Sequence, residues 1–146
     1  MADVKIKILR DGVNMPKYAT EGSAAVDLSA AIEEPMTLLP GERRLIPTGI
    51  AISIPNGTVA IVCARSGLSY KKGINAANGI GVIDSDYRGE IFFSAANISS
   101  EPYTVEPGER VAQLMLMPYL RMELIRTDDL DKTEIGEGGF GSTGRA

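Results

Sequence analysis

The chain has 146 residues, no histidine, one cysteine and a formal net charge of −4. This length indicates one domain, and the acidic balance argues against a nucleic-acid polymer as partner, because polyphosphate backbones attract clustered positive charge. Without histidine, the chain cannot build Ser-His-Asp or Cys-His nucleophilic sites or histidine-ligated zinc. Cys63 has no partner for an internal disulfide, and no apolar run reaches the roughly 18 to 20 residues that span a bilayer. We therefore expect a soluble cytoplasmic protein that does not bind membranes.

Apolar residues recur mostly at every second position, which is typical of half-buried strands. Such runs predict strands at 4–9, 43–48, 50–54, 58–62, 80–83, 91–98, 111–117 and 122–125. Helical signals are few: one segment at 66–72, ended by Gly73, and a short turn at 128–130. Many short strands separated by turn residues favour an all-β sandwich or barrel, with a jelly roll as the preferred architecture.

Turn signals separate the predicted strands. The sequence Pro-Gly-Glu-Arg occurs twice, at 40–43 and at 107–110. Pro fixes φ at the start of such a turn, and Gly accepts the positive φ that its end requires. We interpret the two copies as one turn conformation used twice, not as a domain repeat.

The C-terminal segment 134–146 differs from the rest, because it holds five glycines and one aromatic residue, Phe140. A segment of this composition buries too little surface to fold alone. One interpretation is a disordered terminus. The other, which we favour, is a flexible lid whose backbone amides approach a phosphate while Phe140 stacks on a ligand. We therefore predict a folded domain at 1–133 and a mobile glycine-rich arm at 134–146.

Three segments place polar or charged side chains within or directly after an apolar strand. Asp27 lies in an otherwise apolar run, where an acid needs a partner or a metal unless it faces solvent. Arg65, Ser66 and Gly67 follow an apolar strand at the predicted helix start, so they form either an anion cradle or an ordinary serine cap. Gln113 interrupts a later apolar strand, where alternation alone would turn it outward.

The segment 78–90, Asn-Gly-Ile-Gly-Val-Ile-Asp-Ser-Asp-Tyr-Arg-Gly-Glu, has the highest density of functional groups. Asp84 directly follows an apolar stretch, so we expect it at a strand end, where scaffolds present functional groups. The alternative is a polar hairpin tip without function. The pair Asp84 and Asp86 is also similar to a calcium loop, but the other ligands of that pattern are missing.

Together, these five segments resemble the motifs of the homotrimeric deoxyuridine triphosphatase family, the dUTP diphosphatases. The resemblance runs from about Lys5 to Gly144, and its most specific part is 81–90. It implies a jelly-roll subunit in a homotrimer with shared active sites, and hydrolysis of dUTP to dUMP and diphosphate with Mg²⁺. That reaction keeps dUTP low and supplies dUMP for thymidylate synthesis.

The resemblance also implies a role for each segment in binding the nucleoside and attacking the phosphate. Asp84 would activate the water that attacks the α-phosphorus, a contribution of about 10²- to 10⁴-fold for a general base. Asn78 and the backbone of Val82 and Ile83 would recognise the uracil edge. Tyr87 would stack on the deoxyribose and exclude a 2′-hydroxyl group.

The implied phosphate and metal contacts come from the remaining segments. Arg65, Ser66, Gly67 and Gln113 would hold the phosphates. Asp27 would help anchor Mg²⁺ through water or orient Arg65. In the arm, Phe140 would stack over the uracil, and the amides around Gly141 and Ser142 would face the phosphates.

One position departs from the family pattern, because Ile135 stands where an arginine usually clamps the terminal phosphate. An alkyl group cannot replace a guanidinium, so Lys132 or Arg145 would take that role or affinity for the triphosphate would fall. Two alternatives share the fold. A dCTP deaminase would release ammonia from dCTP, and a regulatory protein would bind the nucleotide but hydrolyse it poorly.

Overall fold

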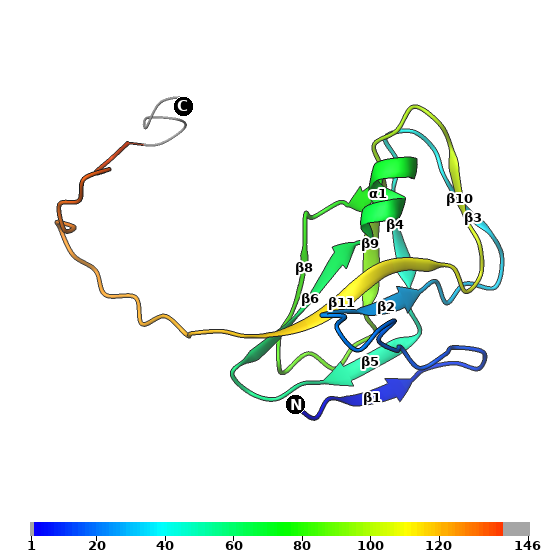
Figure 1. Ribbon diagram of the computed structural model, residues 1–146, viewed down its shortest axis with the longest axis horizontal. Helices are drawn as coiled ribbons and strands as arrows, with labels where there is room; N and C mark the ends of the chain where they lie inside the picture. Colours follow the sequence, from blue (N-terminus) through cyan, green and yellow to red (C-terminus); the bar gives the residue numbers. More distant parts are fainter. Residues whose placement is uncertain (1, 139–146) are drawn as a thin grey trace.

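The computed structural model describes residues 2–138, and in this part the regular secondary structure is almost all strand, with one short helix (Figure 1). The elements, in chain order, are β1 (Lys5–Ile8), β2 (Val26–Ser29), β3 (Met36–Leu38), β4 (Arg43–Pro47), β5 (Ile50–Ser53), β6 (Thr58–Ala64), α1 (Ser66–Lys72), β7 (Ile74–Ala76), β8 (Gly81–Ile83), β9 (Phe92–Asn97), β10 (Tyr103–Val105) and β11 (Arg110–Pro118). The predicted all-β class is confirmed, and α1 has the bounds that the sequence predicted. No separate strand was expected for β3, β7 or β10, which are three-residue strands.

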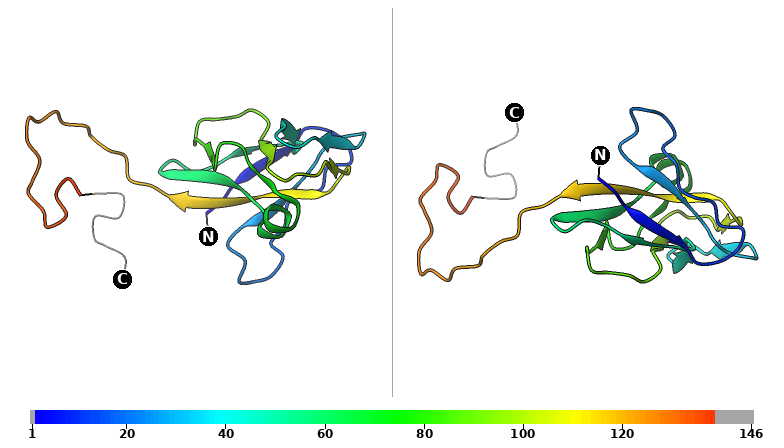
Figure 2. Two further views of the ribbon diagram at one scale, coloured as in Figure 1. Left: turned by 90° about the horizontal axis from the view of Figure 1, so that it is seen from above. Right: turned by 90° about the horizontal axis from the view of Figure 1, so that it is seen from below.

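The strands form antiparallel sheets with non-consecutive neighbours. The largest sheet has the order β2-β11-β6-β8, and smaller sheets contain β4-β9-β7, β1-β5 and β10-β3. In the two views of Figure 2, β11 runs beside β6, as their register of Ala112 with Ala64 through Pro118 with Thr58 requires. The strands β2 and β8 lie at the two edges of the largest sheet, and this places the groups of the site.

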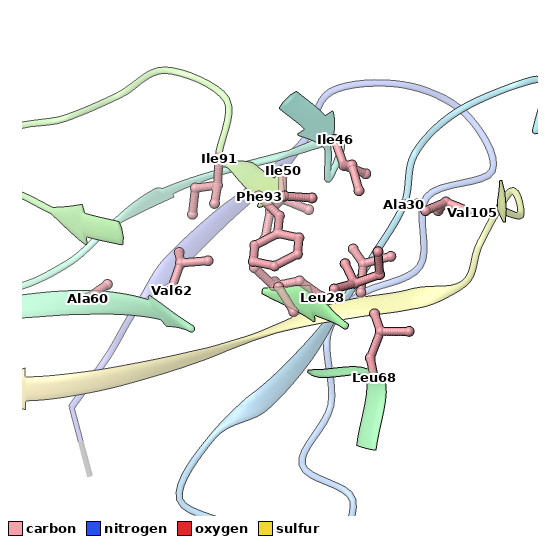
Figure 3. Packing of buried hydrophobic residues seen from close by; sticks show 14 of the residues in the cluster. Leu28, Ala30, Ile46, Ile50, Ala60, Val62, Leu68, Ile91, Phe93 and Val105 are labelled. Atoms are coloured by element: carbon pink, nitrogen blue, oxygen red, sulfur yellow. The ribbon is translucent and has the colours of Figure 1, made fainter. Parts of the chain in front are cut away.

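The core lies between the sheets. Phe93 from β9, 1% exposed, is surrounded by Leu28 and Ile50 (Figure 3). Residues Ile46 and Val62 belong to the same cluster, as do residues of β3 and β10, so strands from all four sheets share one core. A Phe→Ala change at such a position typically costs about 3–5 kcal/mol of folding free energy.

The two Pro-Gly-Glu-Arg turns adopt the same conformation. Gly41 and Gly108 both have φ of 77°, a value that favours glycine. In each turn the glutamate carboxylate accepts a hydrogen bond from the backbone N–H three residues earlier: Glu42 from Leu39 at 2.9 Å, and Glu109 from Glu106 at 3.0 Å. The interpretation of one turn used twice is therefore confirmed, and the glutamate is the residue that closes it.

Beyond β11, the chain leaves the sandwich to one side and forms no strand as far as residue 138 (Figures 1 and 2). The predicted strand at 122–125 is wrong for this single chain, because Met122 is 79% exposed and Leu124 86% exposed, without a partner strand. The predicted turn at 128–130 is only a bend at Asp128. Within residues 2–138, no helix has the length and apolar character needed to cross a bilayer.

Candidate active site

Asp27 lies at the centre of a polar cluster on one face of the largest sheet. Its side chain is 15% exposed. The carboxylate oxygen Oδ1 accepts hydrogen bonds from Arg65 Nε at 3.0 Å and from Gln113 Nε2 at 3.5 Å, and Oδ2 accepts one from Arg110 Nη1 at 3.0 Å. The guanidinium of Arg65 also donates to the Arg110 carbonyl at 3.1 Å. Asp27 therefore fixes the orientation of two guanidinium groups and one amide.

Strand register explains why these side chains meet. Asp27 on β2 pairs with Gln113 on β11, which pairs with Cys63 on β6, and Arg65 follows two residues later. Strict alternation would place Arg110 on the core face with Ala112. A register shift between Arg110 and Ala112, typical of a β-bulge, turns Arg110 to the face of Asp27 instead.

Arg65, Ser66, Gly67 and Gln113, which the sequence predicted as phosphate ligands, line one cavity of about 340 Å³. Three further residues complete its wall: Lys71, Lys72 and Tyr103. Within residues 2–138, neither lysine takes part in an ion pair. The cavity thus gathers two ammonium groups, a guanidinium, a hydroxyl and an amide, a donor set suited to a polyanion.

Tyr103 is held in its neutral form at this cavity. Burial raises the pKa of its hydroxyl, and the hydrogen bond that this hydroxyl donates to the Glu109 carboxylate raises it further. Tyr103 therefore adds no negative charge that would oppose an anion.

The second group of predicted residues surrounds β8. Among residues 2–138 this strand pairs only with β6, through Ala60 with Ile83 and Val62 with Gly81, and is an edge of its sheet. An edge strand leaves part of its backbone N–H and C=O groups without a strand partner, so they can bind a ligand. Asn78 precedes β8 and Asp84 follows it, and both are exposed. Within the described chain, the Asp84 side chain makes no hydrogen bond or ion pair.

The turn after β8 is closed by its own hydrogen bonds. The Tyr87 N–H donates to the Asp84 carbonyl at 3.2 Å, and the Tyr87 hydroxyl donates to the Glu90 carbonyl at 2.9 Å. Arg88 donates to the Ser85 carbonyl at 2.7 Å. This loop is therefore a folded support for Asp84 and not a loose hairpin tip.

The structure brings the predicted residues together as two groups and not as one. Asp27, Arg65, Ser66, Gly67 and Gln113 belong to the phosphate cavity or its supporting cluster. The second group, around β8, contains Asn78, Val82, Ile83, Asp84 and Tyr87, and none of these lines that cavity. The predictions on Phe140, Gly141 and Ser142 lie outside the described residues.

Sequence reasoning missed several groups. Arg110 carried no recognisable signal, because a bulge turns it toward Asp27. Lys71 and Lys72 have the pattern of an exposed helix end, and only the cavity relates them to Arg65.

A second, larger cavity of about 1070 Å³ lies between the loop at 10–19 and β2. It is lined by Asp27 and Arg110 among others, but by none of the β8 group.

The comparisons with known proteins cover nearly the whole chain. The dUTPase family matches residues 11–144. The chain belongs to the dUTPase family. Its curated relatives include the deoxyuridine 5′-triphosphate nucleotidohydrolases of Chromobacterium violaceum, 49% identical over 98% of this chain and 96% of that protein, and of Fusobacterium nucleatum, 47% identical over 99% and 100%.

Solved dUTPase structures share the fold. The dUTPase of Staphylococcus bacteriophage 80alpha, solved with dUpNHpp, has a TM-score of 0.89 and 29% identity, covering 98% of this chain and 99% of its own. A mutant dUTPase of phage phi11 of S. aureus, whose structure describes the coordination of a structural Mg(II) ion, has a TM-score of 0.80 at 24% identity, covering 89% and 99%. The predicted jelly roll is thereby confirmed, as is the resemblance to dUTPases.

Proposed function

We propose that this chain hydrolyses dUTP with the two groups of residues described above. The chain is an enzyme of the dUTP diphosphatase class, and its reaction yields dUMP and diphosphate. The observation that carries the residue assignment is the edge strand β8, flanked by Asn78 and Asp84, in a dUTPase that matches its family over residues 11–144. Ammonia release from dCTP is not favoured, and neither is a purely regulatory role.

Asp84 is the proposed general base. A water molecule hydrogen-bonded to its carboxylate attacks the α-phosphorus, and the carboxylate accepts the proton that the water loses. The bond from the α-phosphorus to the bridging oxygen breaks, and diphosphate leaves. The absence of a side-chain partner for Asp84 within residues 2–138 supports this role, because its oxygens stay available to water.

Base and sugar selection is assigned to the β8 hairpin. The backbone of Val82 and Ile83 presents edge-strand N–H and C=O groups to the uracil, and Asn78 adds an amide at the start of the strand. Cytosine has the opposite donor and acceptor pattern at that edge. Tyr87 stacks on the deoxyribose and leaves no room for a 2′-hydroxyl.

The phosphate chain is assigned to the cavity beside α1. Arg65, Ser66, Gly67 and Gln113 bind the phosphates, and Lys71 and Lys72 add charge at the far end of the helix. Lys72 lies six positions after Ser66 along the helix, a rise of about 9 Å. The two lysines would then bind the terminal phosphates, a role that the uncharged side chain of Ile135 cannot take.

Mg²⁺ is the proposed cofactor, and the donor set accepts it. Mg²⁺ keeps several waters and binds mainly through substrate phosphates, so a protein cage is not required. A carboxylate offers about four acceptor positions. Asp27 uses three of these for Arg65, Gln113 and Arg110, which leaves one on Oδ2 for a metal-bound water. The ion would neutralise phosphate charge during the reaction.

A homotrimer with shared sites is the proposed assembly. The separation of the β8 group from the phosphate cavity supports it, because a complete site then needs groups from more than one copy. The apolar side chains of Leu120, Met122 and Leu124, between 79% and 95% exposed, support it too. The arm at 134–146, with Phe140, Gly141 and Ser142, would close such a site.

We also propose that the enzyme acts in the cytoplasm.

Diphosphate release from dUTP with Mg²⁺ tests the assignment. The wild type should release diphosphate from dUTP but far more slowly from UTP or dCTP. Asp84→Asn should lower kcat by about 10²- to 10⁴-fold. Asp86→Asn, in the same turn, is the matched control and should leave kcat within about twofold. Equal rates for the wild type and Asp84→Asn would contradict the assignment.

A further inference from the structure

We propose that Glu90 is the positioning residue for Tyr87, and that it thereby sets the discrimination between deoxyribonucleotides and ribonucleotides. This inference rests on the proposed role of Tyr87 at the sugar. Glu90 ends the turn that begins at Asp84, and no motif of the sequence analysis gave it a role.

The Glu90 carboxylate is fixed on two sides. Its side chain is 15% exposed. Oε1 accepts a hydrogen bond from the Gly49 N–H at 2.8 Å, and Oε2 forms an ion pair with the guanidinium of Arg10. Arg10 in turn donates to the Ala31 carbonyl at 2.9 Å. The side chain therefore ties the end of the hairpin loop to three separate segments of the chain.

Gly49, whose N–H binds the Glu90 carboxylate, lies in a tightly packed turn. Gly49 has φ of 70°, and a Cβ added there would lie 2.4 Å from Val13 Cγ2 and 2.9 Å from the Ala31 side chain. The turn is therefore restricted to glycine and tightly packed. On either side of it, the Thr48 N–H donates to the Ile91 carbonyl and the Ile91 N–H donates to the Ile50 carbonyl. Glu90 is thus anchored to a rigid frame.

The backbone carbonyl of Glu90 holds the side chain of Tyr87. The Tyr87 hydroxyl donates to the Glu90 carbonyl at 2.9 Å. The phenol also lies over Gly89, where an added Cβ would be 2.4 Å from the hydroxyl oxygen. Tyr87 is 42% exposed, so the ring still presents a face to a ligand. Its position consequently depends on the place of the Glu90 carbonyl.

Steric rejection of a 2′-hydroxyl needs a ring that cannot move. If the Glu90 carboxylate loses its charge, the ion pair with Arg10 weakens, and the carbonyl that holds Tyr87 can shift. A displacement of about 1 Å can change a rate by about 10²-fold. The change should favour UTP, because room beside the sugar relieves a clash that dUTP never makes.

Glu42 provides a matched control in another part of the chain. Its carboxylate also accepts one backbone N–H, that of Leu39 at 2.9 Å, and pairs with one guanidinium, that of Arg44 at 2.7 Å. Its side chain is 28% exposed. Glu42→Gln and Glu90→Gln therefore remove the same chemistry, but only Glu90 is connected to Tyr87.

The experiment measures kcat/KM for dUTP and for UTP, together with Tm, in Glu90→Gln, Glu42→Gln, Tyr87→Phe and the double variant Glu90→Gln/Tyr87→Phe. Glu90→Gln should raise the UTP-to-dUTP ratio of kcat/KM by about 10-fold or more. Glu42→Gln should lower Tm without changing that ratio. In the Tyr87→Phe background the hydroxyl tie is gone, so Glu90→Gln should add little, a non-additivity that marks coupled residues.

A milder variant keeps the test decisive if Glu90→Gln does not fold. Arg10→Gln removes one of the two contacts of the carboxylate and should shift the ratio in the same direction by a smaller factor. An unchanged ratio in Glu90→Gln, or in Arg10→Gln where Glu90→Gln does not fold, would overturn the inference while leaving dUTP hydrolysis intact. Failure of the wild type to hydrolyse dUTP would instead overturn the proposed function.

Discussion

The two groups of the site differ in how their acidic residues are held. Asp27 is 15% exposed and accepts hydrogen bonds from Arg65, Arg110 and Gln113. Asp84 is exposed, and its side chain has no partner within residues 2–138. A carboxylate surrounded by guanidinium groups organises its neighbours, whereas one without partners keeps its oxygens open to water or a ligand. On the proposed assignment, chemistry and support are thus separated between the two edges of one sheet.

Apart from the loss of Asp84, removing the arm should have the largest effect, because the arm would complete the site at both groups. We expect a chain that ends at Thr133 to fold and assemble as the full chain does, with kcat lowered by about 10²-fold or more. Steady-state diphosphate release and sedimentation velocity check the two parts. Loss of the oligomer on truncation would show that 134–146 stabilises the assembly instead.

Asp27→Asn should act mainly on stability and binding, in contrast to Asp84→Asn. It leaves Arg65 and Arg110 without their anionic partner, so we expect a loss of about 1–3 kcal/mol in the free energy of unfolding. KM for dUTP should rise more than kcat falls, because Arg65 is no longer oriented. Urea unfolding and steady-state kinetics measure this, and an unchanged free energy of unfolding would contradict the supporting role.

The double variant Lys71→Ala/Lys72→Ala tests whether the phosphate cavity extends to the end of α1. Exposed charge contacts are worth about 0.2–1 kcal/mol each, so the loss of two should raise KM for dUTP about 2- to 30-fold. The affinity for dUMP should not change, and the effect should shrink at high ionic strength. Lys5→Ala/Lys7→Ala on β1 is the control pair. Equal losses for dUTP and dUMP would remove the lysines from the phosphate site.

Ile135→Arg should give the smallest effect, in the opposite direction. A guanidinium at this position, which is 63% exposed as isoleucine, should lower KM for dUTP by a few-fold, about the value of one exposed ionic contact. Steady-state kinetics checks this. If Lys71 and Lys72 already serve the terminal phosphates, the gain should be larger in the Lys71→Ala/Lys72→Ala background. An unchanged or raised KM would contradict the prediction.

Local signals explain what the sequence could predict. Asp84 follows an apolar run, so its place at a strand end was accessible from the pattern alone. The helix at 66–72 is bounded by Gly73, which has the left-handed conformation at φ of 68°. The repeated Pro-Gly-Glu-Arg turn was identified from its Pro and Gly, and the structure adds that the glutamate closes it by a contact only three residues away.

Contacts between distant segments explain what the sequence could not predict. A bulge in β11 determines the side on which Arg110 lies, and alternation gives the opposite answer. The ion pair of Glu90 with Arg10 joins residues that are 80 positions apart. The expected strand at 122–125 has the right alternation, but a strand also needs a partner, and within the described chain it has none.

Single-turnover hydrolysis by Asp84→Asn, combined with its affinity for dUpNHpp, tests the central claim most directly. The enzyme is mixed in excess with dUTP and Mg²⁺, and dUMP formation is followed over time. We predict a rate constant lower by about 10²- to 10⁴-fold, with the dissociation constant for dUpNHpp within about threefold of the wild type. An unchanged rate constant would contradict the assignment of Asp84 as the base, and so would a loss of rate that arises entirely from weaker binding.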